Sequence, residues 1–375
     1  MTTEPHRWPD HPDLTPSQAW RELLTIPDGT VLDDDRPASL VSIVQRSADQ
    51  HFVDEGLELL SDPRPVRRQR AARVLGQFGF LEGRPFGDRI APALAAAARR
   101  EADAATRAEL VDALGSAEDW RWVPELLHHA SDPHPGVRVA VAASLPLMFA
   151  GAPPDDDTIR TLIVLTSDAD PDVRDWATMS LGVQTDLDTP EIREALAARL
   201  TDEGDTAFEA CVGLARRGDV RALGRVERRL VDPESPVSLL DLEAAVALAD
   251  PALTPLLTRL TGEWSGDEDG HTELLRLALA RSTPDAATTA ADLESATMAL
   301  VERRLAGSGW RIELVGTYPH TRTRFTGPAG EEVTDEIWDG LAPNGFDPQR
   351  QADQWVYQVR AGADDSARSG TPPRE

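Results

Sequence analysis

Apolar residues recur along most of the chain in a helical pattern that repeats about every 34 residues. Seven stretches each end in a leucine that follows another apolar residue by four positions, a spacing that places both on one face of a helix. The residue after each leucine is small or is a proline. The leucines are Leu75, Leu114, Leu145, Leu181, Leu214, Leu248 and Leu279. A period in this range predicts a solenoid of stacked helical units, with leucines such as Leu181 in the core.

A further amphipathic helix is expected before each leucine-ended helix. Ile159, Leu162 and Leu165 illustrate its spacing of three residues. Turns rich in aspartate and proline separate the two helices of a pair, as at Ser131-Asp132-Pro133 and Asp170-Pro171. Aspartate there accepts hydrogen bonds from the free N–H groups of the next helix, and proline suits its first turn. The unit is therefore helix, short turn, helix.

One repeat carries a recognisable signature. The run Asp170-Pro171-Asp172-Val173-Arg174, followed by Ala177 and Leu181-Gly182, resembles the signature of HEAT repeats, most closely the short HEAT-like class named after phycocyanobilin lyases. The resemblance covers roughly residues 50–283, although Ala207, Asp241 and Thr272 replace the arginine in later repeats. It implies an all-α, HEAT-like α-solenoid whose second helices line a concave surface.

The resemblance also implies a role for the arginines at the signature position. They are Arg68, Arg107, Arg138 and Arg174. In HEAT-like arrays such arginines form a ladder with turn aspartates of adjacent units, because positions that repeat usually serve the stack. A line of anion-binding arginines is the alternative.

Four regions are expected along the chain. Residues 1–36 form a loosely packed N-terminal extension with one short helix near Ser17–Leu24, and residues 37–305 form the solenoid, closed by a long helix over Ala287–Leu305. Residues 306–361 form a small aromatic-rich α+β or β module, and residues 362–375 a disordered tail. Alternating residues predict strands over Trp310–Val315, Arg322–Thr326 and Trp355–Arg360. The module either caps the apolar end of the solenoid or is a separate recognition domain.

Composition narrows the classes of function. The net charge is −27, so the chain as a whole repels nucleic acid, and a basic protein is the more natural partner. The alternative is that the net negative charge serves only to keep an extended protein soluble. The absence of a long apolar run argues against a membrane span, and the N-terminal sequence argues against a secretory signal. With a single cysteine, these features predict a cytoplasmic protein.

The basic residues are all arginine, and Asn344 is the only asparagine. Lysine and asparagine have AT-rich codons, so this usage indicates a GC-rich genome. A bacterium of the high-GC actinobacterial kind fits, and a salt-adapted organism is the alternative.

Catalytic chemistry has little support in the sequence. No phosphate-binding loop or paired-cysteine motif stands in a suitable context, and no catalytic residue, metal or cofactor is expected. His128, His129 and His134 flank an Asp-Pro turn and are expected to be a solvated turn rather than metal ligands. Cys211 falls on an apolar helix face, which favours a buried structural thiol over a nucleophile.

One column of positions suggests a binding surface. Two residues after the signature position, the second helices carry Arg70, Glu109, Ala140, Trp176, Glu209 and Glu243. This column lies roughly opposite the core-facing leucines. We therefore expect Glu109, Asp112, Trp176, Glu209 and Glu243 to form an acidic groove with one aromatic anchor, the kind of residue that often dominates interface energy. The alternative is that the acids are ordinary solvated positions.

These features favour a protein–protein scaffold or adaptor that docks a partner, expected to be basic, on the concave face. Two other classes stay open: a lyase or cofactor-handling protein of the phycobilin-lyase type, and a HEAT-like protein that recognises nucleic-acid lesions. The net charge argues against the last. Oligomeric state is not predicted.

Overall fold

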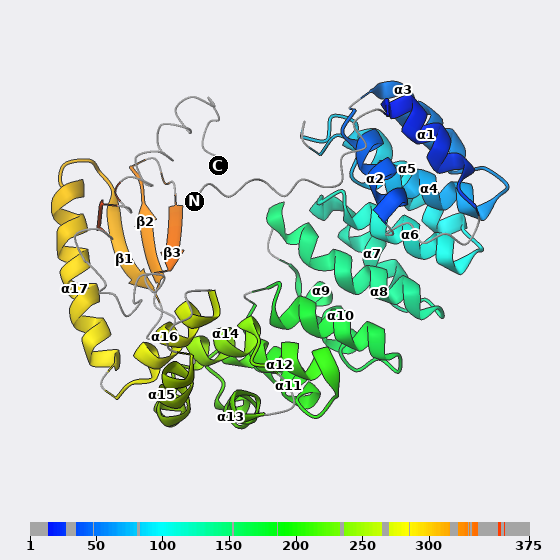
Figure 1. The fold of residues 1–375 in the computed structure, drawn as a ribbon. Coiled ribbons are helices and arrows are strands. Elements are labelled where there is room, and N and C mark those ends of the chain that lie inside the picture. Colours follow the sequence, from blue (N-terminus) through cyan, green and yellow to red (C-terminus); the bar gives the residue numbers. More distant parts are fainter. Residues whose placement is uncertain are drawn as a thin grey trace. The chain divides into compact units, whose positions relative to one another are not determined.

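The computed structural model describes residues 14–27, 35–47, 49–80, 83–151, 154–185, 187–232, 236–264, 270–284, 286–315, 322–328, 330, 332–336, 352–353 and 356. It divides the chain into two compact units, residues 1–187 and 188–375. Figure 1 shows the helices and strands of both units in chain order.

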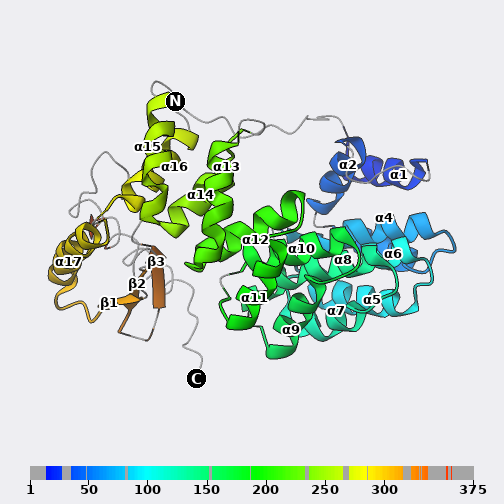
Figure 2. The same cartoon turned by 90° about the horizontal axis from the view of Figure 1, so that it is seen from below.

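The first unit consists of helix pairs joined by short turns. Its helices are α1 (Pro16–Thr25), α2 (Asp35–Gln45), α3 (Gln50–Leu59), α4 (Pro65–Gly76), α5 (Gly87–Arg100), α6 (Ala104–Gly115), η2 (Trp120–Trp122), α7 (Val123–His129), α8 (Pro135–Ser144), η3 (Leu145–Gly151), α9 (Asp156–Leu165) and α10 (Pro171–Gly182). The second helices of the pairs, α4, α6, α8 and α10, contact one another in sequence. In Figure 2 they form one layer, and α5, α7 and α9 form the other.

The turns start the second helices in the way that the sequence predicts. Asp170 caps α10, because its side chain accepts hydrogen bonds from the backbone N–H groups of Asp172 and Val173. Asp103 caps α6 by accepting from the N–H group of Thr106. Proline occupies the first turn of α4, α8 and α10, where its missing N–H group costs no hydrogen bond.

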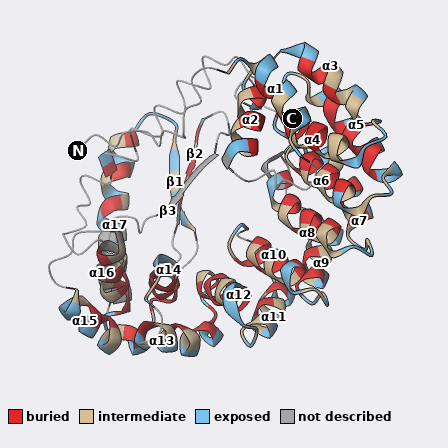
Figure 3. Cartoon of the chain, turned by 45° about the vertical axis from the view of Figure 1, so that its right-hand side comes forward, coloured by how far each residue is buried: buried red, intermediate tan, exposed pale blue. Residues whose placement is uncertain are grey.

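The repeat leucines form the core. Six of the seven are buried, Leu181 among them, and Leu279 is half-buried. The apolar residues four positions earlier are all buried: Ala71, Leu110, Val141, Ala177, Ala210, Ala244 and Leu275. In Figure 3 the buried residues follow the sides of the helices that face other helices.

The N-terminal helix departs from the expectation of loose packing. The predicted helix near Ser17–Leu24 is α1, and it contacts both α2 and α4. Trp20 is buried and meets Phe52 of α3 edge to face, with ring centroids 6.3 Å apart. A buried tryptophan of this kind contributes a large apolar area, so α1 is part of the core of the first unit.

The second unit continues the same pairing. Its helices are α11 (Pro190–Arg199), α12 (Gly204–Arg216), η4 (Val220–Ala222), α13 (Leu223–Val231), α14 (Leu239–Leu248), η5 (Pro251–Leu253), α15 (Thr254–Glu263), α16 (Gly270–Ser282) and α17 (Ala286–Leu305). Second helices again contact one another, α12 with α14 and α14 with α16. In the described part of residues 50–283 all regular secondary structure is helical, and this confirms the all-α, HEAT-like solenoid.

A small sheet follows α17. Its strands, β1 (Arg311–Val315), β2 (Arg322–Thr326) and β3 (Glu332–Glu336), are antiparallel in the order β1-β2-β3. Ile312 pairs with Phe325, and Phe325 packs in a core with Val301 and Leu305 of α17. The sheet therefore packs against one side of α17, which confirms a small C-terminal module with strands; whether it serves as a cap or as a recognition domain stays a prediction.

Two of the three predicted strands are confirmed as β1 and β2. The third, Trp355–Arg360, lies outside the described residues except for Val356, which is helical and belongs to the core with Phe325. Strand β3 was not predicted, because Glu332–Glu336 has too little apolar character to indicate a strand. The predicted tail lies outside the described residues, and the boundaries after residues 36, 305 and 361 stay predictions. Within the described residues we find no helix with the length and apolar character that a membrane crossing requires.

Candidate docking surface

Three of the four signature arginines, Arg68, Arg107 and Arg138, form the predicted ladder with carboxylates of adjacent repeats. The fourth, Arg174, donates to the backbone carbonyl oxygens of Asp168 and Ala169, at 2.9 and 3.2 Å. Arg107 donates to both carboxylate oxygens of Asp132, at 2.7 and 3.1 Å, and Arg138 to both of Asp168, at 2.7 Å each. Arg68 pairs in the same way with Glu101, at 2.6 and 2.7 Å. Each of the three also donates to a backbone carbonyl six residues earlier in its own turn. These three guanidinium groups hold adjacent repeats together. Because they are already bonded to carboxylates, they do not support the alternative of a line of anion-binding arginines.

The ladder shifts the titration of its carboxylates. Hydrogen bonds from Arg138 hold the pKa of Asp168 below its ordinary value of 3.8, more strongly than burial raises it. Burial alone would raise the pKa of Asp132, but the bonds from Arg107 and the backbone outweigh it, and that pKa is also lowered. The ladder is therefore ionised at neutral pH.

We call the side of α4, α6, α8 and α10 that carries Arg73, Glu109, Asp112 and Trp176 the second-helix face. The polarity of its side chains changes along the first unit. At α4 and α6 it is polar. Arg73 of α4 and Glu109 of α6 form an ion pair, with Nε to Oε1 at 2.6 Å and Nη2 to Oε2 at 3.0 Å. The Glu109 side chain is only 13 % exposed, so this acid is held by the stack. Asp112, one turn further along α6, is half-buried.

At α8 and α10 the second-helix face is apolar. Trp176 of α10 is 38 % exposed, and Met179 and Val183 follow it on the same side of the helix. Leu147, which directly follows α8 in η3, is also exposed. Trp176, Met179 and Val183 therefore give the α10 end of the face an apolar character, next to the polar side chains of α4 and α6.

A hollow of about 250 Å³ opens at the polar end; we call it the inner hollow. Its lining comes from α2, α4, α6 and the residues that follow α4 and α6: Ala38, Val41, Ser42, Gln45, Arg73, Gly76, Gln77, Phe80, Glu109, Asp112, Ala113 and Ser116. It lies below the about 300–1,000 Å³ of most small-molecule sites. It has the size for one side chain of a partner.

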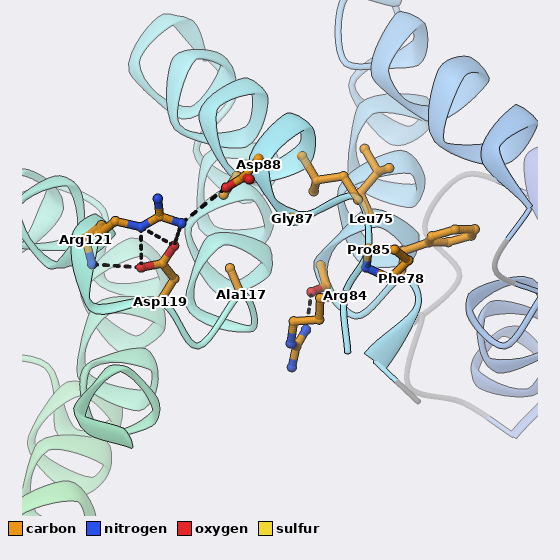
Figure 4. A pocket seen from close by; sticks show the side chains of 12 residues that line it. Leu75, Phe78, Arg84, Pro85, Gly87, Asp88, Ala117, Asp119 and Arg121 are labelled. Atoms are coloured by element: carbon orange, nitrogen blue, oxygen red, sulfur yellow. Dashed lines mark hydrogen bonds and ion pairs between the residues drawn. The ribbon is translucent and has the colours of Figure 1, made fainter. Parts of the chain in front are cut away.

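A second hollow, of about 210 Å³, lies at the edge of the first unit, between the loops that leave α4 and α6. Figure 4 shows Arg121 and Asp119 on one side and Arg84, Phe78 and Pro85 on the other. The Arg121 guanidinium contacts Asp119 at 2.6 Å and Asp88 at 3.2 Å. The charges that line this edge hollow are therefore all paired: Arg121 with Asp119 and Asp88, and Arg84 with Glu118, which lies outside the lining.

Two positions of the predicted column, Arg70 and Ala140, differ from the expectation that the column faces outward. Arg70 does not point to solvent: it is 1 % exposed, because its guanidinium donates to the carbonyl oxygens of Ile26 and Pro27, at 2.6 and 3.2 Å. Ala140 is buried as well. The segment after α1 thus covers the first position of the column.

The five predicted site residues are divided between the units. Glu109, Asp112 and Trp176 belong to the second-helix face of the first unit. Glu209 and Glu243 lie on α12 and α14 of the second unit, where Glu243 pairs with Arg216 at 3.4 Å. Their place in one groove with Trp176 stays a prediction. The sequence analysis did not single out four residues of the face and of the inner hollow: Arg73, Leu147, Met179 and Phe80. Their spacing from the repeat leucines could have indicated that they lie outside the core.

The histidine turn differs from the expectation of a solvated turn. His129 is buried, with Nε2 3.5 Å from Oε1 of Glu125, and Arg99 holds Glu125 through both carboxylate oxygens. Burial lowers the pKa of His129 despite the nearby carboxylate. His134 caps α8 instead. Among the described residues, no group of three or more His, Cys, Asp and Glu side chains is arranged to hold a metal ion.

Cys211 is buried in α12, as expected for a structural thiol. Burial raises its pKa to about 11, so the thiolate is scarce at neutral pH.

Comparison with known proteins agrees with the fold. Residues 91–182 match the family described as HEAT repeats. The chain is 26 % identical over 250 residues to protein YibA of Escherichia coli strain K12 and of Escherichia coli O157:H7, covering 64 % of this chain and 85 % of YibA. The X-ray structure of E. coli YibA superimposes with a TM-score of 0.54 at 24 % identity, over 70 % of this chain and 94 % of that one. The comparisons thus agree with HEAT repeats over residues 91–182 and with a HEAT-like solenoid fold for the chain.

Proposed function

We propose that this protein is a docking scaffold, and that the second-helix face of its first unit binds a basic protein. The observation that carries the proposal is the exposure of Trp176, which Met179 and Val183 follow on the same side of α10. Large aromatic side chains at the centre of an interface often supply most of its binding energy. Repeat scaffolds of this fold present such faces to partners.

Charge supports the choice of partner. The net charge of −27 attracts basic proteins over long range and raises their association rate, an effect that salt weakens. Asp112 and Glu109 lie at the polar end of the same face. Apolar contact would supply affinity, and the acids would supply orientation.

The phycobilin-lyase alternative gains no support from the two hollows. Each is smaller than a site for an ordinary drug-sized ligand, and a tetrapyrrole is larger still.

The test starts from affinity capture with the full chain and identification of what is retained. The purified partner is then titrated calorimetrically against the parent, Trp176→Ala and Val164→Ala. Val164 is the matched control, because it is 64 % exposed but lies on the first helix α9. We expect Trp176→Ala to weaken binding by at least about 1 kcal/mol, roughly fivefold, and Val164→Ala to have no effect. Equal affinities of all three proteins would contradict the proposal.

A further inference from the structure

The second unit carries a local excess of positive charge in an acidic chain. Residues 216–229 contain six arginines and two acids, whereas the whole chain has a net charge of −27. This cluster extends from the end of α12 through η4 into α13. Charges more than about 8 Å away from an exposed site are largely screened at physiological ionic strength. A ligand at α13 therefore responds to these arginines more than to the net charge of the chain.

Two arginines of the cluster hold the fold together. Arg229 donates to both carboxylate oxygens of Asp241, at 3.1 and 3.0 Å. Asp241 stands at the signature position, where earlier repeats have the arginine. Arg221 contacts Asp219 and Glu194, at 2.7 Å each. Carboxylates thus neutralise both guanidinium groups, and neither is available to a ligand.

Arg225 and Arg228 differ from these two. Arg225 donates to the carbonyl oxygen of Leu200, at 3.4 Å, and Arg228 to that of Gly224 in its own helix, at 3.2 Å. Within the part of the chain that the structure describes, neither guanidinium group is paired with a carboxylate, that of neighbouring Glu227 included. Arg228 is exposed and Arg225 is half-buried. Their positive charges therefore meet only neutral carbonyl groups.

The helix surface beside these arginines is open. Gly224, Arg228 and Val231 follow one another at spacings of four and three residues, so they share one side of α13. A Cβ atom at Gly224 would have no other atom within 4 Å, and Val231 is 45 % exposed. We call Gly224, Arg225, Arg228 and Val231 the α13 face. A polypeptide can approach it closely at the glycine, between two cations and an apolar side chain.

We propose that the α13 face binds an acidic segment of a partner protein, with carboxylates of the segment bonded to Arg225 and Arg228. Guanidinium groups match carboxylates in bidentate geometry, as Arg107 and Arg138 do within this chain. Val231 favours a protein segment over a nucleic acid, because it offers apolar contact beside the charges. The inference goes beyond the proposed function: it adds a second surface, with a partner of opposite charge.

The α13 face can be tested on the full chain by fluorescence anisotropy at about 0.15 M salt. The probe is a labelled peptide of sequence Asp-Glu-Leu-Asp-Glu, and the matched neutral probe is Asn-Gln-Leu-Asn-Gln. A single-stranded DNA with the same number of negative charges represents the other class of ligand. We expect the acidic peptide to bind about tenfold more tightly than either. Equal binding of the neutral peptide, or tighter binding of the DNA, would overturn the proposal.

Arginine variants locate the site. Arg225→Gln and Arg228→Gln should each weaken binding of the acidic peptide about fivefold, because each removes one charged hydrogen-bond donor group. Arg160→Gln is the control, since Arg160 is an exposed arginine of α9 that is already paired with Asp157, and it should bind as the parent does. If Arg160→Gln weakens binding as much as Arg228→Gln, the site is not on α13. Should Arg225→Gln fail to fold, Arg228→Gln decides, because Arg228 bonds only within its own helix.

Gly224→Glu tests the charge while keeping every arginine. A glutamate four residues before an arginine on a helix pairs with it, so this variant should weaken peptide binding about fivefold by neutralising Arg228. Gly224→Gln, which has the same size without the charge, should weaken it about twofold or less. Equal binding by the two variants would exclude the charge of Arg228 as the source of affinity. These residues all lie outside the second-helix face, so the inference and the proposed function can fail separately.

Discussion

At the scale of single residues, the repeat consists of positions at which the size of the side chain decides whether the helices can pack. The leucines fill the core, and the glycine that follows some of them allows neighbouring second helices to approach. A Cβ atom at Gly76 would lie 2.9 Å from the Cα atom of Ala113, and one at Gly115 would lie 2.0 Å from Oγ of Ser144. The pattern of leucine followed by a small residue is thus a consequence of helix-to-helix distance.

Replacing Gly76 with alanine should therefore destabilise the protein. Because backbone atoms of α6 occupy the space, we expect a loss of about 1–3 kcal/mol in the free energy of unfolding, the usual cost of overpacking. Urea denaturation measures it. Gly262→Ala is the control, since Gly262 lies in α15 with nothing within 4 Å of its Cβ position. A Gly76→Ala variant as stable as the parent would contradict this account of the repeat.

Leu181→Ala tests the register of the core. Leu181 is fully buried in α10, so truncation should cost about 2–5 kcal/mol through lost burial and the cavity left behind. Thermal melting or urea denaturation reports the change. Leu147→Ala, at an exposed position, should have a much smaller effect, and similar losses at both sites would show that the register is wrong.

Residues that depart from the pattern mark the limit of prediction at this scale. The repeat places Arg70 on the outward column, yet the carbonyl oxygens of Ile26 and Pro27 draw its guanidinium into a buried site. The sequence around His129 suggests a solvated turn, yet His129 is the last residue of α7 and is buried beside Glu125, which Arg99 of α5 holds through both carboxylate oxygens. Both depend on contacts between distant segments, which a local pattern does not contain.

At the scale of elements, the sequence predicts the helices well because their start signals are local. Aspartate and proline in the turns specify where α6, α8 and α10 begin, and the leucine spacing specifies their buried sides. The small sheet is less predictable. Residues that face opposite sides of the sheet alternate clearly in character along β1 and β2. Strand β3 is polar, and it forms a strand because it pairs with β2. The packing of α1 depends on Trp20 meeting Phe52, a contact between separate helices.

The ladder between repeats makes stability depend on pH. Asp168 has a lowered pKa in the folded protein, so its contribution is present above its ordinary value of 3.8 in the unfolded chain and is lost as pH falls through the folded value. Asp168→Asn should cost about 1–3 kcal/mol at pH 7, because Arg138 loses a charged partner at a largely buried position. The difference from the parent should shrink as pH falls below about 4.

Urea denaturation at several pH values between neutral and acidic measures this dependence. Asp157→Asn provides the control, since its ion pair with Arg160 on α9 is largely exposed and should contribute little. A gap between parent and Asp168→Asn that stays constant with pH would exclude the ion pair as its source.

At the scale of the whole molecule, composition suggests what kind of partner to look for but contains no information about where that partner would bind. The net charge indicates a basic partner, and the repeat indicates a scaffold. The sequence also identifies Trp176 as an outward residue. It does not reveal that Arg73 holds Glu109, nor that Phe80 and Asp112 line one hollow, because these facts arise from packing between α2, α4 and α6.

The most direct test of the docking surface is site-specific photocrosslinking. A photoreactive phenylalanine analogue is placed at position 176, at position 147 or, as a control, at position 164, and each full-length variant is irradiated with the captured partner. Crosslinks from 176 and 147 with none from 164 are the result we predict. Crosslinks from 164 alone, or from none of the three while the partner remains bound, would contradict the central claim that the second-helix face of the first unit is where the partner docks.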